Sequence, residues 1–350
     1  MKNRNLLLTL FAIAAMFGLL FVAEQSLDSY KLRILNLCAI YVVLALSMNL
    51  VNGFTGLFSL GHAGFMAVGA YTTALLTMPA TVKAQNFFMA PLIKPLDTIQ
   101  LPFLAALLIA GLLSALVGLL IGAPVLRLKG DYLGIATLGF GEIIRVIFVN
   151  TQSLTNGALG LKGIPTTTTI WWSFGVAAAT VILIGSLINS SFGRALKAIR
   201  EDEIAAQSMG INLFGHKVLS FSIGAFFAGI GGGLLGNLLG TVDPSQFKFV
   251  LTFNILLIII LGGMGSITGS IISAFIVTIA GEALRFLDES MTIGSLYIPG
   301  IPGMRMVVFS ALLMLVVLFF RKGLMGTNEF TWDRIFGKGE KRQAVKGGSN

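Results

Sequence analysis

Charged residues are scarce in this chain. They make up 11% of its 350 residues, whereas an average soluble domain has about 25%. Hydrophobic residues make up 55% of the sequence, and the mean hydropathy over the whole length is +0.89. Because no soluble fold buries that much apolar surface, the composition excludes an ordinary soluble protein and indicates a chain with many membrane-spanning segments.

Cysteine and histidine are almost absent, which excludes several kinds of site. Cys38 is the only cysteine, so neither an intrachain disulfide nor a multi-cysteine metal site can form. His62 and His216 are the only histidines, which excludes a histidine-rich metal site. We therefore expect no metal and no resident cofactor.

Sequence motifs of enzymes are also missing. The chain has no GxSxG and no HExxH. Its glycine-rich stretch "GGMGSITGS" (262–270) lacks the Gly-Lys-Ser/Thr end that holds phosphates in a P-loop. We expect a chain that is not an enzyme, and if ATP drives it, partner chains bind and hydrolyse the nucleotide.

Positive charges outnumber negative ones, and the formal net charge is +9. In a membrane protein this excess reflects the Lys and Arg that collect on the cytoplasmic side, so we expect no nucleic-acid partner. If the N-terminus is cytoplasmic, four basic clusters lie on the cytoplasmic side of the membrane. Lys31 and Arg33 are exceptions, because they lie on the outer side. The four clusters are Lys2 with Arg4, Arg127 with Lys129, Arg194 with Lys197 and Arg200, and Arg321 with Lys322.

Apolar segments of about 20 residues, the length that spans a bilayer, recur along the chain. They predict an all-α transmembrane bundle of about ten helices in one domain (1–326), with both termini cytoplasmic and a polar, disordered tail (327–350). We read the first segment as an uncleaved helix rather than a cleaved signal peptide. The outer loops would be 79–101, 151–168, 242–248 and 288–302. The segments begin near Leu6, Ile34, Gly56, Pro102, Tyr132, Thr169, Lys217, Val250, Ile267 and Gly303.

One polar stretch, "SSFGRALKAIREDEIAAQSMGIN" (190–212), interrupts the apolar sequence. Its residues form helices well, Asp202 suits the cap of a second short helix after a bend, and Gly210 suits the residue after a helix end. A helix on the membrane surface is one interpretation. Its charges are of mixed sign, which suits anionic lipid poorly, so we favour a helix presented to a protein partner.

A second stretch, "NLVNGFTGLFSLGHAGFMAVGAY" (49–71), is rich in small residues. It contains Asn49, Gly61 and His62, which are candidates for lining a translocation path if the segment is a broken or re-entrant helix. Ordinary close packing through small residues is the alternative, and we favour it slightly. For His62 we favour a hydrogen-bonded structural role over a proton relay.

Two charge pairs lie inside apolar segments: "GEIIR" (141–145) and "GEALR" (281–285). Glu142 and Arg145 are three residues apart, share a helix face, and lie deep in a predicted span. Charges at that depth usually face the bundle interior or a water-filled cavity. Two interpretations remain open, a lining of the substrate path and a self-neutralising structural pair. For Glu282 and Arg285, nearer a helix end, we favour the structural one.

Several motifs, in order, resemble one family of transport proteins. "AAQSMG" is similar to the EAA loop of ABC importer permeases, although Ile204 stands where that pattern has Glu, and Glu203 lies one residue earlier. "GDYLGIATLGFGEIIRVIFVN", "LTNGALGLKGIP", "SSFGRALKAIREDEIAAQSMGIN" and "RKGLMG" look like the M-type permease subunit of the bacterial high-affinity branched-chain amino acid (Liv) system. The resemblance covers about 34–326.

The resemblance implies a function and a set of partners. It implies import of branched-chain amino acids by alternating access, in contact with the lipid of the inner (plasma) membrane. The implied protein partners are an H-type permease, two cytoplasmic ATPases and an extracytoplasmic binding protein. Permeases for urea, amides or other amino acids are similar, so these solutes are alternative substrates. A stand-alone transporter or channel, or a membrane scaffold, is the alternative from a different class of protein. The residues it implies for ATPase coupling are Arg194, Arg200, Glu203, Ala205, Ala206 and Gly210.

Overall fold

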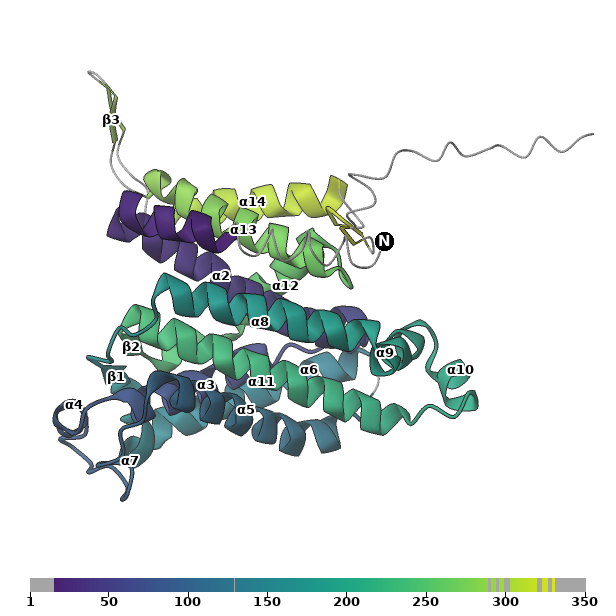
Figure 1. Ribbon diagram of the computed structural model, residues 1–350, viewed down its shortest axis with the longest axis horizontal. Coiled ribbons are helices and arrows are strands. Elements are labelled where there is room, and N and C mark those ends of the chain that lie inside the picture. The colour runs from purple at the N-terminus through teal and green to yellow at the C-terminus, as the bar shows by residue number, and fades with distance from the viewer. Residues whose placement is uncertain are drawn as a thin grey trace, which may run out of the picture.

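The computed structural model describes residues 16–128, 130–288, 291–293, 296–298, 303–319, 323–326 and 329–330. Long helices lie side by side in this part of the chain, roughly parallel or antiparallel to one another (Figure 1). The long helices are α2 (Ser29–Asn49), α3 (His62–Thr77), α5 (Phe103–Val125), α6 (Asp131–Asn150), α8 (Ile170–Asn189), α11 (Leu213–Leu239), α12 (Phe249–Gly262), α13 (Ile267–Ala283) and α14 (Met304–Phe319).

Shorter elements join these helices. They are the π-helical turn η1 (Leu50–Phe54), the helices α4 (Ala80–Asn86), α7 (Gln152–Thr155), α9 (Ser191–Glu201) and α10 (Glu203–Ser208), and the 3-10 turns η2 (Gly157–Leu159), η3 (Pro244–Phe247) and η4 (Leu284–Leu287). Two antiparallel strand pairs, which the all-α prediction did not include, lie in the loops. They are β1 (Leu161–Lys162) with β2 (Thr241–Val242), and β3 (Met291–Ile293) with β4 (Leu296–Ile298).

The predicted apolar segments correspond closely to these helices. Within the described residues, nine of them coincide with a long helix; the segment near Leu6 begins outside those residues, and 16–26 are helical. Five helices are long and apolar enough to cross a membrane: α2 continued by η1, α5, α6, α8 and α11. One start was wrong, because α3 begins at His62 and not near Gly56. The count of ten spans and the side on which the termini lie stay predictions.

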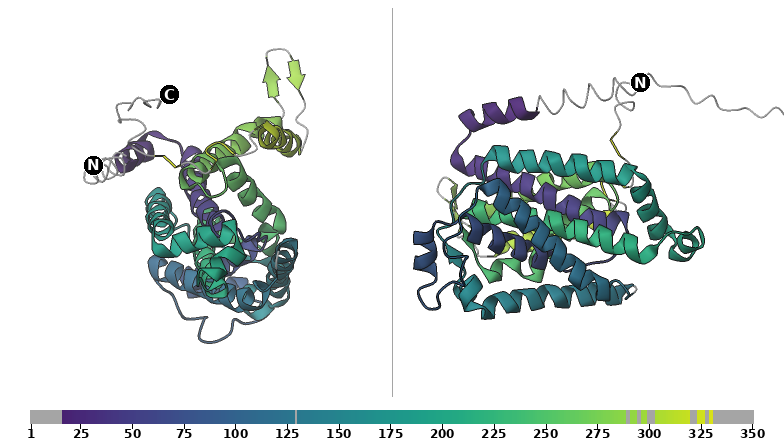
Figure 2. Two further views of the ribbon diagram at one scale, coloured as in Figure 1. Left: turned by 90° about the vertical axis from the view of Figure 1, so that its right-hand side faces the viewer. Right: turned by 60° about the horizontal axis from the view of Figure 1, so that its bottom comes forward.

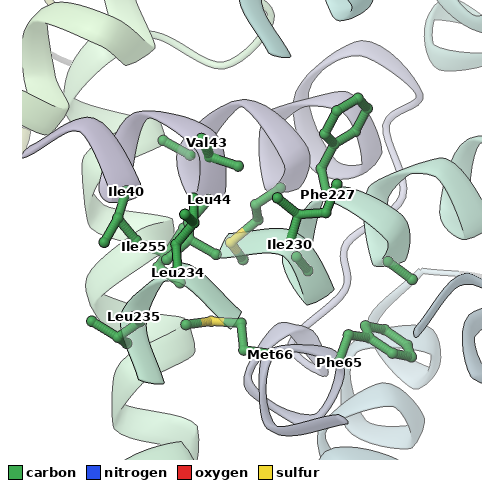
Figure 3. Packing of buried hydrophobic residues seen from close by; sticks show 14 of the residues in the cluster. Ile40, Val43, Leu44, Phe65, Met66, Phe227, Ile230, Leu234, Leu235 and Ile255 are labelled. Atoms are coloured by element: carbon green, nitrogen blue, oxygen red, sulfur yellow. The ribbon is translucent and has the colours of Figure 1, made fainter. Parts of the chain in front are cut away.

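The core surrounds α11. This helix packs against α5, α3 and α2, and α2 packs in turn against α13 and α8. Figure 3 shows Leu44 of α2, Leu234 of α11 and Ile255 of α12 packed together. α2 and α11 are therefore buried over most of their length, whereas a third or fewer of the residues in the most apolar part of α5, α6 and α8 are buried.

Glycines set the distance between α3 and α11. A Cβ on Gly69 would lie 2.0 Å from the Gly229 carbonyl oxygen, and one on Gly232 would lie 2.1 Å from the Met66 carbonyl oxygen. Neither contact leaves room for a methyl group. The close approach that we expected of small residues in apolar helices is therefore present here.

The two ends of the bundle differ in character. At one end, on the right of Figure 1, α9 and α10 project beyond the long helices, and α4, α7, β1 and β2 gather at the other end. Arg127 lies at the α9 end, 5.8 Å from the Phe214 ring centroid at the start of α11. Lys31 and Arg33 lie in the first turns of α2, at the opposite end of that helix from Asn49.

Loops expected on one side of the membrane do meet at one end. β1 of loop 151–168 pairs with β2, and Asn86 of loop 79–101 exchanges two hydrogen bonds of 2.9 Å with the Lys162 backbone. Lys83 is buried nearby and donates to the carbonyls of Leu96 (2.7 Å) and Ile99 (2.5 Å). Burial lowers the pKa of the Lys83 ammonium. Figure 2 shows the β3–β4 hairpin standing away from the helices.

The glycine contacts between α3 and α11 give the first testable prediction. Gly232→Ala should destabilise the protein by about 1–3 kcal/mol, because the added methyl group forces two backbones apart. Gly175→Ala, on α8, has nothing within 4 Å of its Cβ and serves as the control. Thermal unfolding in detergent measures both variants. Equal stability of the two would contradict this account of the packing.

Candidate functional site

A helix break lies inside the bundle between α2 and α3. The helical chain stops after η1 at Phe54, residues 55–61 have no helical structure, and α3 begins at His62. His62 Nε2 lies 2.7 Å from Ser47 Oγ, and both residues are buried. Ser47 comes seven residues before Phe54, roughly 10 Å along the helix axis. The chain therefore turns back into the bundle before α3 starts.

Side chains from neighbouring elements satisfy the backbone of this break. The Asn52 side chain bonds Ser59 twice, donating to its carbonyl at 3.1 Å and accepting from its N–H at 3.4 Å. Thr137 of α6 accepts from Leu60 N–H at 2.9 Å. Thr252 of α12 accepts from the N–H of residue 63 at the same distance. Irregular backbone is tolerated at membrane depth when protein groups pair it in this way.

The small-residue stretch thus shows both features that we weighed. It contains the break, which close packing alone does not require, and its glycines also pack. A Cβ on Gly61 would lie 2.6 Å from the Thr137 carbonyl oxygen of α6. His62 has the buried hydrogen bond expected of a structural residue. Contact of this segment with a substrate stays a prediction.

Asn49 links the end of α2 to the turn between α12 and α13. Its amide nitrogen donates to the Ser266 carbonyl (2.9 Å) and to Ser270 Oγ (2.8 Å), and its oxygen accepts from Gly265 N–H (2.8 Å). The residue is fully buried. These three side-chain bonds reach a segment more than 200 positions away, so Asn49 fixes tertiary structure whatever else it does.

Glu142 and Arg145 pair with each other on α6. Arg145 Nε donates to Glu142 Oε2 at 2.6 Å, and the two side chains are 26% (Arg145) and 31% (Glu142) exposed. Glu142 also lines a small cavity beside Leu60 and Gly64, next to the helix break. The pair is therefore partly covered but not enclosed by this chain. The second predicted pair lies at the C-terminal end of α13, where Glu282 contacts both Arg285 (3.3 Å) and Tyr30 (2.6 Å).

Polar residues cap α9 and α10 and hold them at a bend. Asp202 Oδ1 accepts from the N–H groups of Ile204 (2.8 Å) and Ala205 (3.0 Å), which confirms it as the cap of α10. Gly210 follows α10 with a positive φ of 82°. The N–H of Gly210 bonds the Gln207 carbonyl, and the next N–H bonds the Ala206 carbonyl, as in a Schellman motif. This confirms Gly210 as the residue that ends the helix.

The α10 surface combines anchored and exposed residues. Ala206 is 3% exposed, and Glu203 Oε1 accepts from the buried Lys217 of α11 at 2.5 Å. Ile204 and Met209 are 77% and 83% exposed. A short polar helix and the residue that follows it therefore present two large apolar side chains outward.

Arg194 and Arg200 of α9 differ in direction. Arg194 is exposed. Arg200 turns inward, and its Nη1 donates to the Gly53 carbonyl at 3.1 Å, beside Gly265. Asn49 also bonds Gly265. A candidate for the translocation path and a candidate for ATPase coupling, which lie far apart in the sequence, therefore adjoin the same residue in the fold.

Sequence reasoning missed several residues of this region. Lys217 begins an apolar segment, and its charge so close to the membrane was a usable signal. Ser266 and Glu329 gave none. Glu329 lies past the expected domain end, and its carboxylate accepts from the N–H groups of Ile267 (2.6 Å) and Thr268 (3.1 Å) at the start of α13. Across the described residues, no group of three or more His, Cys, Asp or Glu side chains is placed to hold a metal.

The helices, the buried break and the capped polar projection define a polytopic helical membrane protein. The chain belongs to the family described as "Branched-chain amino acid transport system / permease component", which matches residues 30–318. The protein is accordingly a permease component of a transport system, and its relatives of this kind are not enzymes.

Curated relatives include both types of permease protein of one transport system. The chain is 35% identical to the high-affinity branched-chain amino acid transport system permease protein LivM of Escherichia coli, over 82% of this chain and 70% of that protein. It is 25% identical to a probable LivM of Methanocaldococcus jannaschii (81% and 89% covered). It is 26% identical to LivH of Salmonella typhimurium (83% and 92%). No solved structure matches the chain.

The Asn49 contacts give a prediction for stability. Asn49→Ala should destabilise the protein by about 3 kcal/mol, because it removes three hydrogen bonds and leaves the buried N–H of Gly265 without its partner. Asn150→Ala is the control, since its exposed side chain bonds only a carbonyl of its own helix, that of Val146. Thermal unfolding in detergent compares the two. A loss no larger than that of the control would show that Asn49 does not hold the turn.

Proposed function

We propose that this chain is a permease subunit of an ATP-driven (ABC) importer and that α9 and α10 couple it to separate ATPase subunits. The observation that carries the proposal is the pair of exposed side chains at α10, Ile204 within the helix and Met209 directly after it. Burying one such side chain in a partner's groove contributes about 1.5–3 kcal/mol. Asp202 and Gly210 fix both ends of α10, so the projection is rigid enough to transmit movement.

The charges around α10 support a protein partner over a lipid surface. Arg200 and Glu201 form an ion pair on α9, and Glu203 pairs with Lys217. An anionic membrane surface attracts a basic face, whereas these charges are already matched within the chain. In the proposal ATP is bound only by the partner ATPases, and the permease needs no cofactor.

Charge placement supports a cytoplasmic position for the α9 end. Arg127 and the three cations of α9, Arg194, Lys197 and Arg200, lie at that end of the bundle. Cytoplasmic segments collect Lys and Arg, so this end would face the ATPases in an inner (plasma) membrane. The loops tied together by Asn86 and Lys162 would then face the extracytoplasmic binding protein.

The names of the relatives support the substrate and the second permease. LivM and LivH are named as permease proteins of high-affinity branched-chain amino acid transport. We propose that this chain works with an H-type permease in transport of those amino acids, by alternating access. Urea, amides or other amino acids are the alternative substrates.

The position of Glu142 and Arg145 supports a translocation path along α6. The two partly exposed charges would be costly against lipid tails, so a second subunit or water must cover that face. α6 also adjoins the helix break, since Thr137 bonds Leu60 there. We propose that Glu142, Arg145 and the break with Gly61 line the path, between this chain and its partner permease.

The exposed isoleucine of α10 tests the proposal directly. Ile204→Glu should lower affinity for the ATPase subunits by roughly tenfold to a hundredfold, the equivalent of one buried isoleucine. Co-purification from cells that express the whole transporter measures it. Ile93→Glu is the matched control, an exposed isoleucine in the loop at the opposite end. If ATPases co-purify equally with both variants, α10 is not their docking site.

Gly210 gives a second prediction for coupling. Gly210→Val should leave the bundle folded and yet uncouple ATP hydrolysis from uptake, because valine strongly disfavours the left-handed φ that ends α10. Gly303→Val is the control, another glycine at positive φ with open space around it, outside α9 and α10. Uptake per ATP hydrolysed in proteoliposomes measures the effect. A normal ratio in Gly210→Val would contradict the coupling role.

A charge exchange tests the path along α6. The double variant Glu142→Arg/Arg145→Glu keeps an i,i+3 ion pair, so a structural pair should tolerate it. A path lining should not, because the position of each charge facing the substrate is reversed. We expect unchanged thermal stability and uptake at least tenfold lower. Full uptake would identify the pair as structural.

The unaltered chain tests the other classes of protein. Uptake without ATPases would indicate a stand-alone transporter or channel, and an absence of flux in every assembly would indicate a scaffold.

A further inference from the structure

Arg200 joins the α9–α10 projection to the start of the helix break by a side-chain hydrogen bond, and Lys197 of α9 lies beside it, with its Nζ 5.9 Å from the Phe54 ring centroid. Arg200 lies in the last turn of α9, and its side chain is 28% exposed. Nη1 donates to the Gly53 carbonyl at 3.1 Å, and Gly53 belongs to η1 at the start of the break. On the other side, Nη2 bonds Glu201 Oε1 at 2.5 Å, which orients the guanidinium.

Three glycines form the surface against which Arg200 lies. A Cβ on Gly56 would lie 2.8 Å from Arg200 Cγ, and one on Gly265 would lie 2.7 Å from Arg200 Nη1. A Cβ on Gly53 would lie 2.5 Å from the Gly265 nitrogen. Gly56 and Gly265 also have positive φ values of 75° and 90°. This close fit requires glycine at the three positions, two of them before α3 and one in the turn between α12 and α13.

The turn that carries Gly265 is itself attached to three other parts of the chain. Asn49 holds it to the end of α2. The backbone of residues 324 and 325 donates to the carbonyls of residues 261 and 262 just before the turn, at 2.7 and 3.1 Å. Glu329 bonds the N–H groups just after it. A displacement of Arg200 would therefore act on the ends of α2, α12 and α13 together.

Space for such a displacement exists beside Arg200. A cavity of about 430 Å³ is lined by Asn52, Gly53, Gly56, Phe58, Arg200, Glu201 and Met264. The neighbouring segment 55–61 has no ladder of helical hydrogen bonds, and irregular segments of this kind move at lower cost than intact helices. The non-helical segment, the cavity and the arginine thus lie together.

We propose that Arg200 is the positioning residue that transmits movement of α9 to the helix break at 55–61 and to the turn at 263–266. The proposal rests on the proposed function and adds the route by which an ATP-driven movement reaches the membrane. The planar guanidinium bonds Gly53 and Glu201 at once, which a flexible ammonium group reproduces poorly. Arg200 thus acts within the permease and not as a contact to the ATPase.

The first experiment compares Arg200→Met with unaltered protein in the complete transporter reconstituted with its ATPases and binding protein. Methionine retains the apolar packing and removes the donors. We expect normal co-purification of the ATPases, ATP hydrolysis within twofold of the unaltered protein, and uptake per ATP about tenfold lower, the equivalent of one charge-assisted hydrogen bond. Arg127→Met is the matched control, an exposed arginine at the same end of the bundle, and should couple normally.

A second readout separates transmission of movement from a merely structural role. A Phe58→Cys chain, labelled by a membrane-impermeant thiol reagent, reports access to the cavity beside Arg200; the native Cys38 is fully buried. We expect the labelling rate to change at least fivefold between nucleotide-free and ATP-bound transporter with Arg200, and less than twofold with Arg200→Met. An equal nucleotide response in both chains would overturn the proposal.

The outcomes also separate this inference from the proposed function. If the unaltered chain binds no ATPases, the proposed function fails. If it couples normally and Arg200→Met does so too, only the role of Arg200 fails. Arg200→Gln, which retains an amide donor on a shorter side chain, should assemble and lose coupling as well. If neither variant assembles with the ATPases, Arg200 is a structural residue and the proposal is overturned.

Discussion

The structure depends on one constraint, which is that backbone polar groups at membrane depth must find partners within the protein. Helices meet it without help. Residues 55–61 do not. Asn52 and Thr137 supply partners to them, and Thr252 supplies one to the N–H of residue 63 in the first turn of α3. These side chains come from α2 with its η1 extension, from α6 and from α12, so pairing the backbone of the break also fixes where those helices lie. The break is thus a point of attachment as well as an interruption.

Close packing of glycines makes this arrangement possible. α3 starts inside the bundle, and it reaches α11 only because Gly69 and Gly232 allow the two backbones to approach. The same device recurs at the α9 end, where Gly53, Gly56 and Gly265 make room for Arg200. In lipid, where the hydrophobic effect gives helices little reason to associate, such close contacts supply much of the attraction between them. Glycine therefore serves both the stability of the core and the fit of its polar junction.

Local rules were sufficient to predict much of this fold. Apolar length predicted nine of the long helices, with the start of α3 misplaced, and the residue types at Asp202 and Gly210 predicted the cap and the end of α10. The break was harder, because a glycine-rich apolar stretch is compatible with a packed helix and with an interrupted one. Contacts such as Asn49 with Gly265 join residues more than 200 positions apart, and nothing in the spacing of one sequence indicates them. Sequence could nominate Asn49 and Arg200, but only the fold shows that both meet at Gly265.

That meeting changes how the polar projection is understood. A charged segment outside the membrane needs only its exposed face to bind a partner, and Ile204 and Met209 supply that face. Arg200 points the other way, into glycines that belong to the membrane-embedded part of the chain. A docking element without this inward contact would hold a partner and act on the bundle mainly through α8 and α11, to which it is joined by the chain and by the Glu203–Lys217 ion pair. Since those two helices are long and continuous, whereas residues 55–61 are not helical, the side-chain contact reaches the more deformable part of the bundle.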